Sequence, residues 1–210
     1  MNNRRFARTA GWLALPCLVA AGLLAWYVTR EPATPFEQEQ AKATFDPALI
    51  SRGEYVARLS DCVACHSLAG KAPFAGGLEM ATPLGAIHAT NITPDKQTGI
   101  GTYSLADFDR AVRHGVAPGG RRLYPAMPYP SYVKLSDDDI KALYAFFMQG
   151  IQPANQPNIP SDIPWPLNMR WPIALWNGVF APTATYAVKP NQDALWNRGA
   201  YIVQDRKSVV

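Results

Sequence analysis

Apolar residues cluster in four stretches of the chain, and three of these stretches have the spacing of helices. From Ala10 to Val28 no residue is charged. In residues 47–59, 104–115 and 140–148 the apolar side chains recur three or four positions apart, which is the period of an amphipathic helix. No stretch alternates convincingly between apolar and polar residues, so we expect an all-α protein.

Capping residues mark where the three amphipathic helices begin. Asp46-Pro47 supplies an N-cap followed by proline at the first helical position. Ser104-Leu-Ala-Asp107 and Ser136-Asp-Asp-Asp139 both match the capping-box pattern. Gly115 is placed to end the second helix. The stretch 67–103 between the first two helices is rich in Gly, Pro and Thr, and we expect it to be loop.

The uncharged run Ala10–Val28 predicts a membrane anchor. It is just long enough to cross a hydrocarbon core of ~30 Å as a helix that rises ~1.5 Å per residue. Arg4, Arg5 and Arg8 precede it, which would leave the N-terminus in the cytoplasm and export the rest of the chain. A cleavable signal peptide is the alternative, because Val19-Ala20-Ala21 resembles a cleavage site. The run continues past the end expected of a signal peptide, which favours an uncleaved anchor.

The formal net charge is +4, from 20 basic and 16 acidic residues. Three of the basic residues are the arginines before the anchor, which leaves 17 basic against 16 acidic residues in the remainder. The body of the protein is therefore almost neutral, and nothing in its charge indicates nucleic-acid binding.

The pentapeptide Cys62-Val-Ala-Cys65-His66 carries the clearest chemical signal in the chain. It reads C-x-x-C-H, the attachment pattern of a c-type haem. Two thiols three positions apart on one helical turn can each form a thioether to a haem vinyl group. The histidine that follows can then offer a ring nitrogen to the iron as an axial ligand. The sequence therefore predicts covalent haem at Cys62 and Cys65, with His66 on the iron.

Two other interpretations of the cysteine pair are weaker. A structural zinc ion would need two more ligands at zinc spacing, but His88 and His114 are isolated in the sequence. A thioredoxin-like redox pair would need a βαβ context, which the pattern does not provide. The third cysteine, Cys17, sits within the apolar run and is best explained as a small apolar residue.

An electron carrier needs a second axial ligand opposite His66. The methionines available are Met80, Met127 and Met148. Met80 follows His66 too closely to cross to the other haem face, and Met148 falls on the apolar face of a helix. Met127 lies between two prolines in a segment expected to be extended and rigid, which lowers the entropy cost of holding its sulfur. Met127 is the predicted ligand, with bis-histidine coordination through His88 or His114 as the alternative.

The one local cluster of basic residues lies just before Met127. It consists of Arg110, Arg113, Arg121 and Arg122. Arg121 or Arg122 could pair with a haem propionate, and the alternative is ordinary solvated charge.

Several motifs, in order, resemble one protein family. They are Gly76-Gly77, Pro83-Leu-Gly85, Asn91-Ile-Thr-Pro-Asp95, Thr98-Gly-Ile-Gly101, Phe108 to Gly115 and Leu123-Tyr-Pro-Ala-Met-Pro-Tyr129. The chain resembles the membrane-bound cytochrome c subunits of bacterial alcohol, aldehyde and related periplasmic dehydrogenases over residues 46 to about 204. In the resembling cytochrome c domains, the first helix crosses the last at a glycine and packs an aromatic, positions that Gly53 and Tyr55 match.

The resemblance implies a fold, a cofactor and partners. It implies a cytochrome c-like haem domain behind an N-terminal transmembrane helix, with one covalent haem c on Cys62 and Cys65 and axial iron ligands His66 and Met127. It implies a dehydrogenase catalytic subunit carrying PQQ, flavin or a molybdenum cofactor as the electron donor, and a quinone or terminal oxidase as the acceptor. The haem domain would face the periplasm from the inner membrane.

The chain departs from the family in holding a single C-x-x-C-H, where such subunits usually have three haem domains. Leu49–Val56 is echoed by Leu195–Ile202, an internal repeat 146 residues apart. The second copy continues through Asp205–Val210 without a cysteine. We therefore expect a chain that starts a second haem domain and loses it, rather than an intentional single-haem protein.

The expected organisation has five parts. They are an anchor (1–30), a linker (31–45), a cytochrome c domain (46–150), a Pro/Trp-rich segment (151–190) and a truncated start of a second domain (191–210). The predicted function is electron relay without bond chemistry of its own. The alternatives are a haem enzyme or sensor with an open sixth position, and a nonfunctional truncated subunit.

Overall fold

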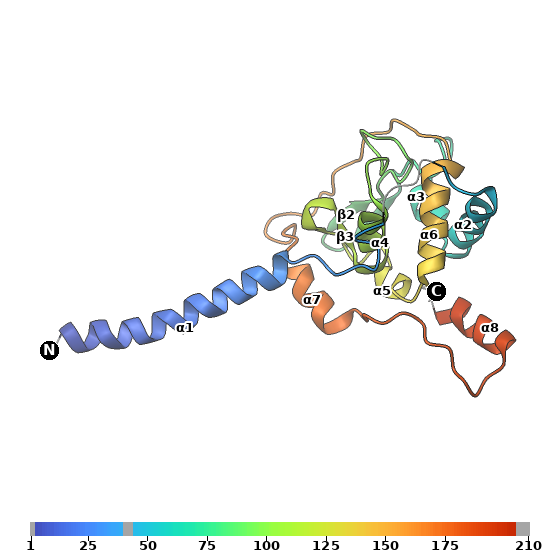
Figure 1. Ribbon diagram of the computed structural model, residues 1–210. Helices are drawn as coiled ribbons and strands as arrows, with labels where there is room; N and C mark the ends of the chain where they lie inside the picture. The colour runs from blue at the N-terminus through green and yellow to red at the C-terminus, as the bar shows by residue number, and fades with distance from the viewer. Residues whose placement is uncertain (1–2, 40–43, 205–210) are drawn as a thin grey trace.

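The computed structural model describes residues 3–39 and 44–204, with side chains for 15–39 and 44–203. A mostly helical body holds the middle of the chain, and α1 projects away from it as one long helix (Figure 1). In chain order the elements are α1 (Asn3–Thr29), α2 (Pro47–Leu59), α3 (Cys62–His66), β1 (Glu79–Thr82), β2 (Gly85–His88), α4 (Leu105–His114), β3 (Val116–Ala117), η1 (Pro118–Gly120), β4 (Arg121–Arg122), α5 (Tyr129–Tyr132), α6 (Asp137–Ala145), η2 (Phe146–Gly150), α7 (Pro172–Phe180) and α8 (Ala194–Gln204).

The predicted caps begin the helices as the sequence indicates. The Asp46 carboxylate accepts a hydrogen bond from the backbone N–H of Ala48, 2.8 Å away, at the start of α2. Ser104 and Asp107 form a complete capping box on α4, and Gly115 ends that helix in the left-handed conformation at φ 64°. Each cap satisfies backbone groups that a helix end leaves unpaired. These three predictions are confirmed.

The core lies where α2 crosses α6 and η2. Gly53 on α2 is buried against Ala142 and Phe146, so the predicted glycine crossing is confirmed. The Phe146 and Phe147 rings meet edge to face, with centroids 5.2 Å apart. Tyr55 does not pack into this crossing as the resemblance suggested, since 48% of its surface is exposed.

Two small antiparallel pairs of strands qualify the all-α prediction. β1 pairs with β2, placing Met80 opposite Ile87. β3 pairs with β4 over two residues each, Val116 opposite Arg122 and Ala117 opposite Arg121. Strands of two to four residues are too short to show the alternation by which strands are predicted. The body is therefore mostly helical with two short hairpins.

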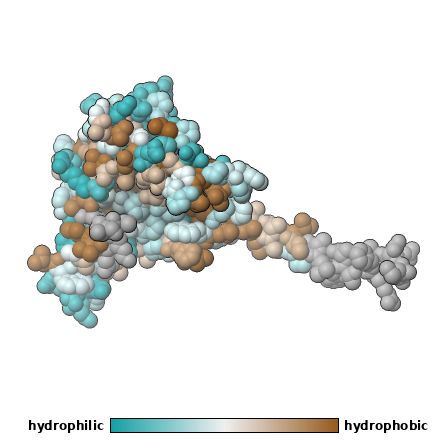
Figure 2. Space-filling view, turned by 180° about the vertical axis from the view of Figure 1, so that it is seen from behind, coloured by the Kyte–Doolittle hydropathy of each residue, from teal (hydrophilic) through white to brown (hydrophobic). Residues whose placement is uncertain are grey.

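The segment after η2 returns along the loops that follow β2. The Asn91 side-chain amide donates hydrogen bonds to the backbone oxygens of Ala154 (2.7 Å) and Gln156 (3.2 Å). The backbone N–H of Asp162 donates to the Ala86 oxygen at 3.1 Å. Beyond this point large apolar side chains stay at the surface, including Trp165 at 78% exposed and Phe180 at 65%. This segment therefore leaves apolar surface exposed. Figure 2 shows brown, hydrophobic patches on the face of the protein turned to the viewer.

Buried arginines hold the chain between α1 and α2 against the body. Arg110 on α4 makes an ion pair with Glu37 and donates to the Pro32 oxygen at 3.0 Å. Arg122 donates to the Arg30 oxygen at 2.8 Å. These bonds fix where the residues that follow α1 lie.

The predicted transmembrane helix is not supported by the described structure. Over the residues it covers, no helix is both long and apolar enough to cross a membrane. The side chains of the arginines before the apolar run lie outside the described residues. The whole tail 205–210, on which the truncation prediction rests, also lies outside them.

Candidate functional site

The cysteine pair sits on α3, a single helical turn that follows α2 through a sharp bend. Ser60 ends α2, donating its N–H to the Val56 oxygen at 2.8 Å. Asp61 then takes the left-handed conformation at φ 54°, which is rare for residues other than glycine. The bend redirects the chain so that Cys62 and Cys65 lie on one turn, both half-buried, with Cys62 packed against the hydrophobic core.

His66 ends α3 and is oriented by a single backbone contact. Its Nδ1 lies 2.7 Å from the Thr90 carbonyl oxygen. A carbonyl oxygen can only accept, so Nδ1 carries the hydrogen and Nε2 of the neutral ring keeps its lone pair. Burial lowers the pKa of His66, and the Thr90 bond partly offsets this by raising it. The net effect holds the imidazole in the neutral form that binds a metal.

Two glycines bring the Thr90 carbonyl to His66. Gly76 donates its N–H to the His66 oxygen at 2.8 Å, and Gly77 donates to the Ala89 oxygen at 2.8 Å. Gly76 has φ 74°, and a Cβ added there would lie 2.5 Å from the Thr90 carbonyl carbon. Only glycine can therefore hold this loop so close to the backbone that orients His66.

The donor set on α3 fits a covalently attached haem. Burial raises the pKa of the Cys65 thiol, and Asp61 adds to the rise, so the thiol is the resting form. Two thiols on one turn can each bond a vinyl group, and the neighbouring imidazole presents an unprotonated nitrogen. A ring nitrogen fixed through its partner N–H to a carbonyl is the usual arrangement of a metal-ligating histidine.

Met127 lies on a different segment from these three residues. It is half-buried between β4 and α5. The expectation of an extended segment was wrong, because the backbone turns twice here. The Met127 N–H donates to the Tyr124 oxygen at 3.1 Å, and the Tyr129 N–H donates to the Met127 oxygen at 2.8 Å. The two flanking prolines thus restrict a turn rather than a straight run.

The other residues considered as iron ligands are Met148, Met80, His88 and His114, and each has a different place in the fold. Met148 packs against the hydrophobic core, as predicted, and Met80 is paired with Ile87 in the first hairpin. His88 on β2 has its Nε2 3.8 Å from a Glu79 carboxylate oxygen. His114 ends α4, where burial lowers its pKa.

Most of the basic cluster is buried in the fold rather than solvated. Arg110, Arg113 and Arg122 are buried. Arg110 and Arg122 hold the linker, and Arg113 pairs with Asp137 at 2.7 Å. Arg121 is the exposed member of the four. The sequence showed four arginines near one another, but it could not show that three of them are buried and make contacts within the fold.

The backbone of Thr90 is the site group that sequence reasoning missed. Its role comes from its carbonyl oxygen, which every residue has, so no residue type at position 90 could reveal it. The glycines at 76 and 77 are the indirect signal, since they mark a close approach of two backbone segments.

Comparisons with known proteins show which proteins this chain is similar to. The family model described as cytochrome c matches residues 50–150. The gluconate 2-dehydrogenase cytochrome c subunit of Pantoea cypripedii is 62% identical over 158 residues, which cover 75% of this chain and 36% of the relative. The cytochrome c subunit of alcohol dehydrogenase (quinone) from Gluconobacter oxydans is 54% identical over 159 residues, 75% of this chain and 33% of the relative.

A further relative matches more of the chain. It is one of the subunits of the nicotinate dehydrogenase from Pseudomonas putida, and it is 40% identical over 198 residues, 94% of this chain and 16% of the relative. The chain therefore spans about a third, or less, of the length of these curated relatives.

Proposed function

Residues 50–150 of this chain are a cytochrome c domain, and from that premise we propose that it transfers electrons through one covalent haem c. The observation that carries the proposal is the orientation of His66. Its Nδ1 is committed to the Thr90 oxygen at 2.7 Å, so Nε2 is left to bind iron. This arrangement directly follows two thiols on one helical turn, which is what covalent attachment requires.

Each proposed site residue has one role. Cys62 and Cys65 form the two thioethers. His66 would hold the iron through its ring nitrogen, and Met127 would hold it through its sulfur. When bound, the haem iron supplies a one-electron couple whose potential depends on its axial ligands, and methionine raises that potential. The chain itself makes and breaks no substrate bond.

The proposed partner is the catalytic subunit of a dehydrogenase. The relatives named above are cytochrome subunits of gluconate and alcohol dehydrogenases and one of the subunits of nicotinate dehydrogenase. All three belong to dehydrogenases, which supports electron delivery to this chain from a catalytic subunit carrying PQQ, flavin or molybdenum, and onward transfer to a quinone or terminal oxidase.

The proposed location is the periplasmic face of the inner membrane. Thioether formation on C-x-x-C-H takes place outside the cytoplasm in bacteria, which requires export. The uncharged run 10–28 behind three arginines supports export by anchor or signal peptide. N-terminal sequencing of the mature protein and an alkaline carbonate wash of membranes distinguish the two. An intact N-terminus that resists the wash supports the anchor.

The test of the function uses cysteine variants. We expect the full chain, produced in a host that matures c-type cytochromes, to keep its haem on a denaturing gel. Cys62→Ser with Cys65→Ser should lose that haem, and Cys17→Ser, outside the motif, should keep it. A wild-type protein without covalent haem would refute the proposal. A reduced wild-type protein that is high-spin and binds carbon monoxide readily would refute electron relay in favour of an open site.

A further inference from the structure

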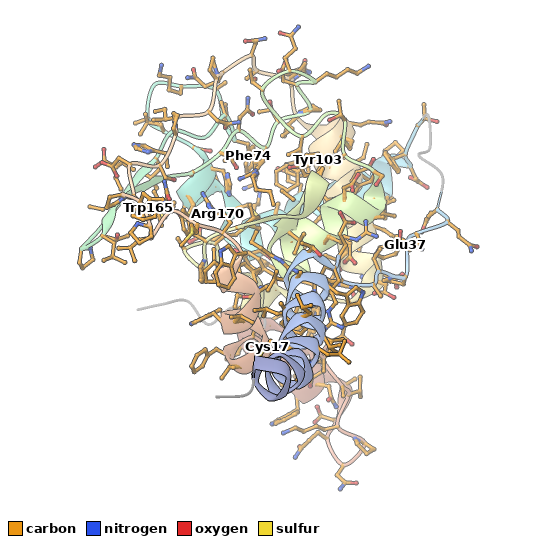
Figure 3. All side chains as sticks on the ribbon, turned by 90° about the vertical axis from the view of Figure 1, so that its left-hand side faces the viewer. Cys17, Glu37, Phe74, Tyr103, Trp165 and Arg170 are labelled. Carbon is orange, nitrogen blue, oxygen red and sulfur yellow. The ribbon has the colours of Figure 1, made fainter. Side chains whose placement is uncertain are left out.

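The two tyrosines that flank Met127 are both held by a segment that lies outside the cytochrome c domain. The guanidinium carbon of Arg170 lies 3.5 Å from the centre of the Tyr124 ring. The same side chain donates from Nη1 to the Arg122 carbonyl oxygen at 3.1 Å. Figure 3, which looks along α1, shows Arg170 turned toward the body while Trp165 points to the outside.

The second contact lies on the other side of Met127. The Tyr129 hydroxyl donates to the Asn177 side-chain oxygen on α7 at 2.7 Å. Tyr129 is 1% exposed, and its ring fills the space beside Gly115, where an added Cβ would lie 2.5 Å from the ring. Its backbone N–H donates to the Met127 oxygen, so the position of Tyr129 determines where the Met127 backbone lies.

Apolar packing does little to hold α7 in this place. Ala174 is its one buried residue, whereas Trp176, Val179 and Phe180 are 38%, 75% and 65% exposed. A helix whose apolar side chains face outward gains little from burial, so its polar contacts contribute to how it docks, together with the approach of Tyr27 on α1 to Gly178. Burial also lowers the pKa of Arg170, which indicates a partly desolvated guanidinium over the ring, where a cation–π contact is stronger.

We infer that Arg170 and Asn177 are positioning residues that clamp the Met127 loop from both sides, so that residues 170–177 control how firmly the sixth iron position is occupied. The inference rests on the proposed role of Met127 as axial ligand. An external ligand would compete with the Met127 sulfur for the iron and would bind when the loop is open. Its apparent affinity therefore scales with the fraction of molecules whose loop is open, and weakening the clamp increases that fraction.

The experiment titrates the oxidised full-length holoprotein with imidazole and records the methionine–iron charge-transfer band. We expect Arg170→Gln and Asn177→Ala each to bind imidazole about tenfold more tightly, equivalent to about 1.4 kcal/mol of loop opening. The charge-transfer band should weaken in both. Arg170→Lys, which keeps a cation over the ring, should stay closer to wild type.

The matched control is Arg198→Gln. It makes the same chemical change at a guanidinium that lies 5.7 Å over the Tyr201 ring, on α8. We expect wild-type imidazole binding from it. A double-mutant cycle with Tyr124→Leu tests whether Arg170 acts through that ring, since the two effects should then not add.

The outcomes separate the inference from the proposed function. Wild-type affinity in the double variant Arg170→Gln with Asn177→Ala, with the wild-type band present, overturns the clamp and leaves Met127 as the ligand. A wild-type protein without the band, or a Met127→Ala protein that keeps it, overturns the ligand assignment and the clamp with it. An equal gain of affinity in Arg198→Gln would show general loosening and also overturn the clamp.

Discussion

Gly53 on α2 touches the backbone of Ala142 on α6 so closely that no side chain fits between them. An added Cβ would lie 2.6 Å from the Ala142 carbonyl carbon and 2.7 Å from Cβ of Phe146. This contact sets the distance between the two helices that frame the core. The internal repeat offers a comparison, because Gly199 on α8 is the counterpart of Gly53 and has no atom within 4 Å of its added Cβ.

The first prediction follows from that comparison. Gly53→Ala forces α2 and α6 apart, and we expect it to lower the free energy of unfolding by ~3 kcal/mol, at the upper end for an overpacked core. Gly199→Ala, at the matched position, should cost nothing or stabilise its helix by up to ~1 kcal/mol. Denaturant unfolding of both variants measures the difference. Equal effects would contradict the close crossing.

The second prediction concerns how α8 docks on the body. The Tyr201 hydroxyl donates to Asp139 at 2.5 Å and accepts from the Ser136 N–H at 3.0 Å. In the expected second capping box the Asp139 side chain would accept from the Ser136 N–H, and the Tyr201 hydroxyl takes that place. The Asp139 carboxylate also pairs with Arg52 at 2.8 Å. Tyr201→Phe should release α8 at a cost of ~1 kcal/mol. Faster proteolysis of residues 187–204 reports the release, and Tyr55→Phe, the exposed counterpart in the repeat, is the control.

The same contact should be sensitive to alkaline pH. The pKa of Tyr201 is raised from 10.0 to about 12, first because burial disfavours the phenolate and then because it donates to Asp139. A released Tyr201 ionises at lower pH than a docked one, so docking is fully stabilised below pH 10 and weakens as the pH rises toward 12. The proteolysis rate should rise over that window in wild type and stay flatter in Tyr201→Phe.

The third prediction tests the loop that orients His66. Gly76→Ala adds a methyl group 2.5 Å from the Thr90 carbonyl carbon, at φ 74°. Gly70 has a similar φ of 78°, but a Cβ added there would have no atom within 4 Å. Gly70→Ala therefore measures the backbone strain alone, which is about 1 kcal/mol. We expect Gly76→Ala to lose clearly more stability and to shift the haem potential, measured by redox titration. Similar behaviour of the two variants would mean that the Thr90 approach does not constrain His66.

The fourth prediction concerns the linker that follows α1. Arg110 is only 10% exposed in its side chain and binds Glu37, Glu31 and the Pro32 oxygen. Arg110→Met should free residues 30–39 at a cost of about 2 kcal/mol, and limited proteolysis should cut there faster. Arg58→Met removes the exposed pair with Glu54, which is worth ~0.5 kcal/mol or less, and serves as control. An unchanged cleavage rate in Arg110→Met would show that other contacts hold the linker.

Local features of this protein could be predicted from its sequence. The Asp46 and Ser104 caps, the C-x-x-C-H turn on α3 and the glycine crossing at position 53 depend on residue type and spacing within a few positions, or on the absence of a side chain. The caps and the cysteine turn are visible in the sequence because their interacting groups are neighbours in the chain. The crossing is visible because glycine has no side chain.

Tertiary structure determined the rest, because the groups involved are far apart in sequence or are not side chains. The carbonyl of Thr90 orients His66 from 24 residues away. Tyr201 completes the cap at Ser136, and Arg110 and Arg122 bind the linker that follows α1. The types and spacing of Cys62, Cys65 and His66 are enough to predict haem attachment, since covalent attachment needs those residues at that spacing. Only the fold decided which partners orient them, because a backbone carbonyl or a buried charge takes its role from its neighbours in space.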